Sequence, residues 1–350
     1  MTDKETIFIK NIYYMLAYAF QPLRPEKEEN IDREAFTSIH NLFASILAQG
    51  MGRQLKQGLY RAYVSHQENL PVLRGKIRMN DTIQNAFSQR RLLSCEYDEL
   101  SENNLHNQIV KSTAQLLLQH PDVAARYKSA LKKSLLYFAG VDSIAPKAIP
   151  WAEIHFQRHN RSYRMLIAVC QMVLEGMLLT TTKGQYRLAQ FVDDQQMSRL
   201  YEKFILAYYI KEWPTVKATT SQIPWALDDG ESALLPVMQS DITLTKAHKT
   251  LIIDAKYYAR TMQTHFNTKT VHSANLYQIF TYVKNKEASF HDQTHEVAGM
   301  ILYAATNEAV QPQQRYQMSG NTICVQTLDL NCPFTEIAAQ LDDIVRVHLL

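Results

Sequence analysis

Two aspartates and one lysine in the second half of the chain have the types and spacing of a metal-dependent hydrolytic site. Asp241 ends one strand-like run, and the next run, Leu251-Ile-Ile-Asp254-Ala-Lys256, carries the other two residues. Side chains alternate between the two faces of a strand, so Asp254 and Lys256 point to the same side. If the runs pair as an antiparallel hairpin around 246–249, Asp241 lies close to Asp254 across the ladder.

This trio suits the hydrolysis of a phosphodiester. Neighbouring carboxylates repel each other, and Mg²⁺ relieves that repulsion while it binds phosphate oxygens and lowers the pKa of a coordinated water. We therefore expect Asp241, Asp254 and the backbone carbonyl of Ala255 to hold Mg²⁺. Lys256 is expected to position or help deprotonate the attacking water, or to stabilise the transition state. A salt bridge between Asp254 and Lys256 without a catalytic role is the alternative.

Three further side chains are candidates to support this site. Gln278 and Tyr282 stand one turn apart on one face of the helix expected over 273–284, where they support the site or contact the scissile strand. Tyr257 follows the catalytic strand and is either a DNA-proximal group or a residue that packs in the core or at its rim.

The elements that must position these residues follow an α/β order. We expect a helix at 195–212, strands at 234–244 and 250–257, a helix at 273–284, strands at 297–305 and 322–328, and a closing helix at 335–349. The first half is expected to be mostly helical, with one β element at 58–79 made of two short strands joined by Ser65–Asn69. The expected domains are residues 1–185 and 186–350, in a mixed α/β protein.

Composition excludes several classes of protein. The chain has 350 residues, of which 46% are hydrophobic and 20% charged, so wholesale disorder is excluded. Four widely separated cysteines argue against a disulfide framework or a structural zinc site. The first residues include acidic side chains where a signal peptide carries cations, and no apolar run approaches the ~20 residues of a membrane helix. We therefore expect a cytoplasmic protein without a membrane partner.

Charge is nearly balanced over the whole chain, at a net +3. Residues 251–290 alone carry five lysines and arginines against two acids, which equals that net charge. Many phosphate contacts would need a broader basic surface. The balance therefore indicates that another protein makes most of the contacts with DNA.

The candidate site resembles that of the PD-(D/E)xK nuclease superfamily. In that superfamily an acidic residue and D/E-x-K occupy adjacent strands of an αβββαβ core, and RecB-like members add Q-x-x-x-Y, here Gln278 to Tyr282. The proline of the motif is absent, since Met238-Gln-Ser precedes Asp241. The superfamily frequently has an acid on an upstream helix, and Glu202 is the candidate, with a solvated surface glutamate as the alternative.

Further motifs, in order along nearly the whole chain, resemble the McrC family of endonuclease subunits from McrBC modification-dependent restriction systems. They are Asn11-Ile-Tyr-Tyr-Met-Leu-Ala-Tyr-Ala, Leu73-Arg-Gly-Lys-Ile, Met197-Ser-x-Leu-Tyr-x-Lys-Phe and Ile253-Asp-Ala-Lys-Tyr-Tyr. The resemblance implies Mg²⁺-dependent cleavage of double-stranded DNA that contains methylated cytosine.

The same resemblance implies a partner, an McrB-like AAA+ GTPase ring that binds GTP and receives the N-terminal half of this chain. No G-x-x-x-x-G-K-[ST] occurs here, so the motor must lie elsewhere. Arg74, Gly75 and Lys76 are the expected partner-binding residues, with simple solubility as their alternative role. Two other functions stay open, a catalytically silent activator of a GTPase and a stand-alone RecB-like DNA-repair nuclease.

Overall fold

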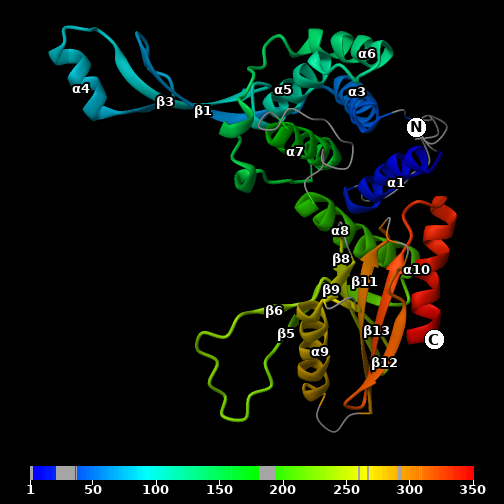
Figure 1. Cartoon of the computed structure of the whole chain (residues 1–350). Helices are drawn as coiled ribbons and strands as arrows, with labels where there is room; N and C mark the ends of the chain where they lie inside the picture. The colour runs from blue at the N-terminus through cyan, green and yellow to red at the C-terminus, as the bar shows by residue number, and fades with distance from the viewer. Residues whose placement is uncertain are drawn as a thin grey trace. The chain divides into compact units, whose positions relative to one another are not determined.

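The computed structural model (Figure 1) divides into two units, Met1–Leu42 with Leu179–Leu350, and Phe43–Leu178. It describes residues 3–20, 36, 38–158, 160–180, 194–258, 261–265, 268–290, 294–306, 308 and 310–350. The predicted boundary at 185/186 lies outside the described residues. At the N-terminus the division differs from the predicted one, because the first 42 residues belong with the C-terminal unit.

Helix α1 (Asp3–Phe20) explains this difference, since it packs against α8 (Asp194–Glu212). The buried Asn11 side chain donates hydrogen bonds to the backbone carbonyls of Leu330 (2.7 Å) and Cys332 (2.8 Å). The ring of Tyr14 stacks on Phe334 with centroids 4.5 Å apart. The Asn11 and Tyr14 side chains thus pack within the unit that contains the C-terminal half, although the expected domain 1–185 included them.

A six-stranded mixed sheet forms the centre of this unit, in the order β12-β13-β11-β8-β7-β4. Strands β8, β11 and β13 run parallel, whereas β4, β7 and β12 are antiparallel to their neighbours. The mixed α/β class is therefore confirmed. The strands are β4 (Lys217–Thr219), β7 (Ile242–Lys246), β8 (Lys249–Lys256), β11 (Glu296–Ala304), β12 (Gln314–Met318) and β13 (Asn321–Leu328).

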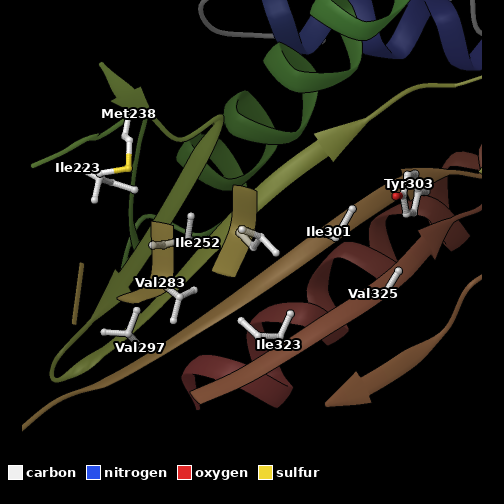
Figure 2. Packing of buried hydrophobic residues seen from close by; sticks show 10 residues of the cluster. Ile223, Met238, Ile252, Val283, Val297, Ile301, Tyr303, Ile323 and Val325 are labelled. Atoms are coloured by element: carbon white, nitrogen blue, oxygen red, sulfur yellow. The ribbon is translucent and has the colours of Figure 1, made fainter. Parts of the chain in front are cut away.

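Helix α9 (Ser273–Ala288) packs through Ile279 and Val283 on the face of the sheet that carries Ile252, Ile301 and Ile323. Figure 2 shows these three isoleucines on neighbouring strands, with Val283 beside them. Ile253, on the opposite face of β8, is also completely buried, and α8 and α10 (Phe334–Leu349) contact that strand as well. Strand β8 is therefore covered on both faces, as its run of aliphatic residues predicts for a central strand.

The main elements of this unit follow one another in the order α8, β4, β7, β8, α9, β11, and β4 is a strand that the sequence did not predict. Two small two-stranded sheets accompany them, β5 (Gln222–Ile223) with β6 (Met238–Gln239), and β9 (Met262–His265) with β10 (Thr268–Val271). The strand predicted over 234–244 is wrong in its first part. Leu234 adopts a positive φ of 68° and is fully exposed, so it cannot lie in a buried strand.

The second unit combines helices with a three-stranded antiparallel sheet of order β1-β3-β2. Its helices bury a core that includes Leu47, Ile109 and Val173, each with no exposed area. The elements are α3 (Ile39–Gln57), which begins in the first unit, β1 (Ala62–Leu70), β2 (Lys76–Ile77), α4 (Met79–Phe87), β3 (Leu93–Ser101), α5 (Leu105–Gln119), α6 (Ala125–Leu135), α7 (Tyr163–Thr180) and the short 3₁₀ turns η1 (Leu136–Phe138), η2 (Pro146–Ala148) and η3 (Trp151–Glu153).

The predicted pair of strands joined by Ser65–Asn69 is wrong. Strand β1 runs through this segment without a turn, and its partner is β3, which the sequence reading missed. The β1–β3 pair is partly exposed to solvent, so it carries polar residues such as Ser65, which lies opposite Asp98. In the sequence these polar residues resemble a turn. Cross-strand side-chain contacts stabilise the pairing of β1 with β3. One of them is the ring of His66, which stacks on the ring of Tyr97 with centroids 5.5 Å apart.

Candidate active site

The hairpin of β7 and β8 brings the two aspartates together. Lys246 pairs with Lys249 beside the turn, and the antiparallel register continues to Ile242 opposite Ile253. Asp241 immediately precedes Ile242, and it therefore lies beside Asp254 on the neighbouring strand. Its carboxylate Oδ2 accepts a hydrogen bond of 2.9 Å from the backbone N–H of Ala255. The predicted hairpin and the predicted approach of the two carboxylates are therefore both observed.

Asp254 is almost completely buried, with 1% of its area exposed. Its Oδ1 accepts a hydrogen bond of 2.9 Å from Lys256 Nζ, whereas its Oδ2 has no hydrogen-bond partner among the described residues. Burial raises the pKa of Asp254 to about 7, Lys256 opposes that rise, and the charges of Asp241 and Glu202 add to it. A buried carboxylate oxygen without a partner is costly unless a cation compensates it.

Lys256 is held as a cation. Burial by itself lowers the pKa of this lysine, but the carboxylates of Asp254 and Asp241 outweigh it, so that the pKa is raised. The side chain keeps 17% of its area exposed, enough for the ammonium to reach a ligand beside the pair. A protonated lysine can position a water or stabilise negative charge, and it is a poor proton acceptor.

Glu202 on α8 adds a third carboxylate. It is half-buried, and its Oε1 accepts a hydrogen bond of 3.1 Å from Ser198 Oγ. Burial raises the pKa of Glu202, and the charge of Asp241 raises it further, while Lys256 opposes the shift. Helix α8 contacts β7 and β8, so the half-buried Glu202 lies on the part of the unit that carries the aspartate pair.

Gln278 and Tyr282 lie together on α9, with Gln278 Nε2 donating a hydrogen bond of 2.9 Å to the Tyr282 hydroxyl. Both are half-buried. Ile279, next to Gln278, packs with Ile252 on the sheet face that also carries Asp254, two residues further along β8. Within the described part of the chain, no hydrogen bond joins this pair to the aspartates or to Lys256.

Three residues that the sequence reading did not assign to the site form a network beside Lys256. Tyr303 on β11 is opposite Lys256 in the parallel register, and it is completely buried. Its hydroxyl accepts a hydrogen bond of 2.9 Å from Asn275 Nδ2, and the Tyr258 hydroxyl donates to Asn275 Oδ1 at 3.3 Å. Burial raises the pKa of Tyr303 to about 12. Nothing in the sequence distinguishes Tyr303 among 19 tyrosines, because only the strand register reveals it.

Tyr257 packs against the core. Its ring meets that of the buried Tyr201 edge-on, with centroids 6.2 Å apart. This contact agrees with the packing alternative for Tyr257.

Arg74, Gly75 and Lys76 lie in the other unit, beside and at the start of β2. The guanidinium of Arg74 lies 3.9 Å from the centre of the Tyr97 ring, and its Nη2 is 3.4 Å from Glu99 Oε2. Lys76 pairs with Glu96 in the ladder. Gly75 has a φ of +66°, and a Cβ there would lie 2.4 Å from the Glu96 carbonyl oxygen. This glycine is needed for a left-handed backbone at a close approach to β3.

We expect Gly75→Ala to destabilise the β1–β3–β2 sheet, because both its φ and its contact with the Glu96 carbonyl exclude a side chain. A loss of about 1–3 kcal/mol in the free energy of unfolding should result. Thermal denaturation of the full chain measures it, with Gly58→Ala as the control. Gly58 also has a positive φ, but its added Cβ meets no atom within 4 Å. An equal loss in both variants would contradict the role of the Glu96 contact.

The mixed sheet and the buried carboxylates define an α/β protein with a candidate metal-binding site at the end of its central hairpin. The chain matches the family model described as McrBC 5-methylcytosine restriction system component over residues 3–303, and it belongs to that family. No described helix is both long and apolar enough to cross a membrane.

Two known proteins resemble the chain over almost all of its length. It is 27% identical to the type IV methyl-directed restriction enzyme EcoKMcrBC of Escherichia coli K12, over 99% of each chain. It also resembles a chain in a half-complex of Thermococcus gammatolerans McrB AAA+ hexamers with bound McrC. That likeness has 18% identity and a TM-score of 0.51, covering 98% of this chain and 78% of the other, and it supports the fold.

Proposed function

We propose that the chain is the Mg²⁺-dependent endonuclease subunit of an McrBC-type restriction complex, with a nuclease domain of the PD-(D/E)xK superfamily. It would act in the cytoplasm, cut double-stranded DNA that contains methylated cytosine, and stimulate the GTPase of its partner. One observation carries the proposal. The buried Asp254 has one carboxylate oxygen without a hydrogen-bond partner in the described structure, while its other oxygen accepts from Lys256 and the neighbouring Ala255 N–H donates to Asp241.

The residues present fit a divalent cation of the hard, oxygen-binding kind. Asp241, Asp254 and the carbonyl of Ala255 would hold Mg²⁺, since this ion prefers oxygen ligands and typically takes one or two carboxylates. The metal, when bound, supplies an acidified water and neutralises charge on the phosphate.

The chain's own groups complete the site. The Lys256 ammonium positions the attacking water or stabilises negative charge on the phosphate. Glu202 orients a water of the site from α8, and Gln278 and Tyr282 support it from α9.

A partner ring is the second part of the proposed function. The T. gammatolerans relative is described as McrC bound to McrB AAA+ hexamers, so we propose an McrB-like ring that binds GTP. The sheet of the second unit is the proposed docking element, where Arg74 is half-exposed. Large apolar side chains are exposed next to this sheet, namely Val72 and Leu73 in the loop before β2, and Met79 and Phe87 at the two ends of α4.

Lys256→Ala tests the proposed function. A supercoiled plasmid with 5-methylcytosine is incubated with the chain, its McrB-like partner, GTP and Mg²⁺, and DNA nicking and GTP turnover are measured in the same mixture. Loss of the ammonium should slow cleavage by at least about a hundredfold, while GTP turnover stays unchanged. Lys249→Ala, at the other end of β8, is the matched control and should retain both activities.

The alternatives predict other outcomes in that mixture. GTPase stimulation by the wild-type chain without any nicking would favour a catalytically silent activator. Cleavage of unmethylated DNA by this chain alone, without GTP, would favour a RecB-like repair nuclease. Full cleavage by Lys256→Ala would contradict the assignment of the site.

A further inference from the structure

Helix α6 and the turn after it form the most one-sidedly charged stretch of the second unit. Residues 123–141 contain four cations and no acid, a local charge of +4 that exceeds the +3 of the whole chain. The rest of the chain therefore carries a slight negative charge. The cations are Arg126, Lys128, Lys132 and Lys133.

These cations lie on the surface. Lys132 and Lys133 are exposed and Lys128 is half-buried, while the opposite side of the helix buries Tyr127 and Leu131. Among the residues that the structure describes, no carboxylate forms an ion pair with any of the three lysines. Asp122, just before the helix, is the acid nearest in sequence, and it lies 4.0 Å from His120 Nδ1.

Helix stability does not account for all of this charge. Lysines in the last turn, such as Lys132 and Lys133, favour the negative end of the helix dipole. Arg126, however, lies in the first turn, which holds no acid, and Lys128 stands two residues later. The guanidinium of Arg126 lies over the Tyr127 ring, 4.6 Å from its centre. Cations near the N-terminus, the positive end of the helix dipole, are unfavourable, so Arg126 and Lys128 lower the stability of α6. A ligand for the positive face explains their presence better than helix stability does.

The turn η1 extends this face with two exposed apolar side chains. Leu136 and Tyr137 are 75% and 69% exposed, although the next residue, Phe138, is buried in the core. Lys111 Nζ donates hydrogen bonds to the backbone carbonyls of Phe138 and Val141, which fixes the turn against α5. The Tyr137 ring is therefore presented on an anchored turn, next to the lysines.

We propose that α6 and η1 bind the phosphate backbone of double-stranded DNA, outside the site of cleavage. Eleven residues of α6 span roughly 16 Å, the length of about five base pairs, so that several phosphates lie within reach of the lysines. The absence of acids from 123–141 suits DNA, whose backbone carries one negative charge about every 1.7 Å along the duplex. Tyr137 and Leu136 would lie against the sugar edge. This inference rests on DNA being the substrate of the chain.

The test compares the DNA affinity of Lys132→Ala/Lys133→Ala with that of wild type. The full chain is titrated onto a short fluorescent duplex in Mg²⁺-free buffer, and anisotropy is recorded over a series of salt concentrations. We expect at least about fivefold weaker binding at low salt, and a log–log salt dependence shallower by about 1.8, since each lost phosphate contact removes about 0.9. The control, Lys56→Ala/Lys217→Ala, removes the same charge from two exposed sites outside α6 and should change neither value.

The outcomes separate this proposal from the proposed function. Unchanged affinity and salt dependence in the α6 variant, or equal losses in the control variant, would overturn the DNA-binding role of α6. Normal DNA binding together with weaker assembly on the McrB-like ring would also overturn it, and would make α6 a protein-docking surface. Weaker binding by the α6 variant would support it even if the wild-type complex failed to cut DNA. Circular dichroism checks that the variant is folded.

Discussion

Asp254→Asn is expected to make the metal-free chain more stable at about pH 8 while it removes the site's function. The folded chain holds a proton on Asp254 up to a pKa of about 7, whereas the unfolded chain releases it near the ordinary value of 3.8. The contribution of this group to stability is therefore fully present below about pH 3.8, and it is lost as the pH rises to about 7. Asparagine avoids that loss because it carries no charge, and its oxygen still accepts from Lys256.

The size of the stability difference follows from the rise in the pKa of Asp254 from 3.8 to about 7. Above pH 7 this rise lowers the free energy of unfolding of the wild type by on the order of a few kcal/mol. Thermal denaturation in the presence of a chelator should show a higher melting temperature for Asp254→Asn at pH 8. The difference should shrink towards pH 5, where Asp254 is protonated. Added Mg²⁺ should stabilise the wild type more than the variant, because the proposed metal site needs both carboxylates.

Asp228→Asn is the control for this prediction, because Asp228 lies exposed in the loop between β5 and β6. It should leave the melting temperature unchanged at both pH values. A wild-type chain that is more stable than Asp254→Asn at pH 8 without metal would contradict the account of a strained, buried carboxylate.

Gly299→Val is expected to cost about 3 kcal/mol of stability, the second large effect. Gly299 lies on β11 beneath α9, and a Cβ at this position would lie 2.7 Å from Val283 Cγ2 and 2.8 Å from Ile279 Cγ1. Both neighbours are completely buried, and protein interiors are close-packed, so they have little room to give way. The helix must therefore shift away from the sheet, together with Gln278 and Tyr282.

Denaturant unfolding of the full chain measures this cost, and DNA cleavage in the reconstituted complex should fall as well. Gly140→Val is the control, since a Cβ on the exposed Gly140 meets no atom within 4 Å. Gly299→Val with wild-type stability would show that α9 is not held against β11 as closely as the structure indicates.

The core of the candidate site could be predicted from sequence because its determinants are local. Asp241, Asp254 and Lys256 lie on two consecutive strands joined by a short turn, so alternation and hairpin pairing are enough to bring them together. The α/β order of the second half follows similarly from hydrophobic periodicity. Glu202 needed the resemblance to a known superfamily as well, since a helix places it from outside the hairpin.

Other features depend on contacts that sequence patterns do not reveal. Asn11 bonds carbonyls 319 and 321 residues away, so its packing with the C-terminal unit could not be predicted from local patterns. Tyr303 joins the site only through its parallel register with Lys256. Strand β1 is so polar that half of it resembled a turn, and it becomes a strand through pairing with β3.

The distribution of charge is another feature that the sequence alone does not place on the surface of the fold. The excess near the candidate site suggested that a partner makes most of the contacts with DNA. A larger excess lies in residues 123–141, and its meaning emerged only when the structure showed these cations gathered on the exposed side of one helix. Composition locates charge along the chain, and the fold decides whether it forms a surface.

The central claim is that Asp241, Asp254 and Lys256 form the centre that hydrolyses DNA. Single-turnover cleavage of methylcytosine-containing plasmid by the reconstituted complex tests it most directly, with wild type and Asp254→Asn compared at equal GTP turnover. Loss of the buried metal ligand should lower the cleavage rate by about a thousandfold or more, equivalent to about 4 kcal/mol of transition-state stabilisation. Cleavage by Asp254→Asn within about tenfold of wild type would contradict the claim.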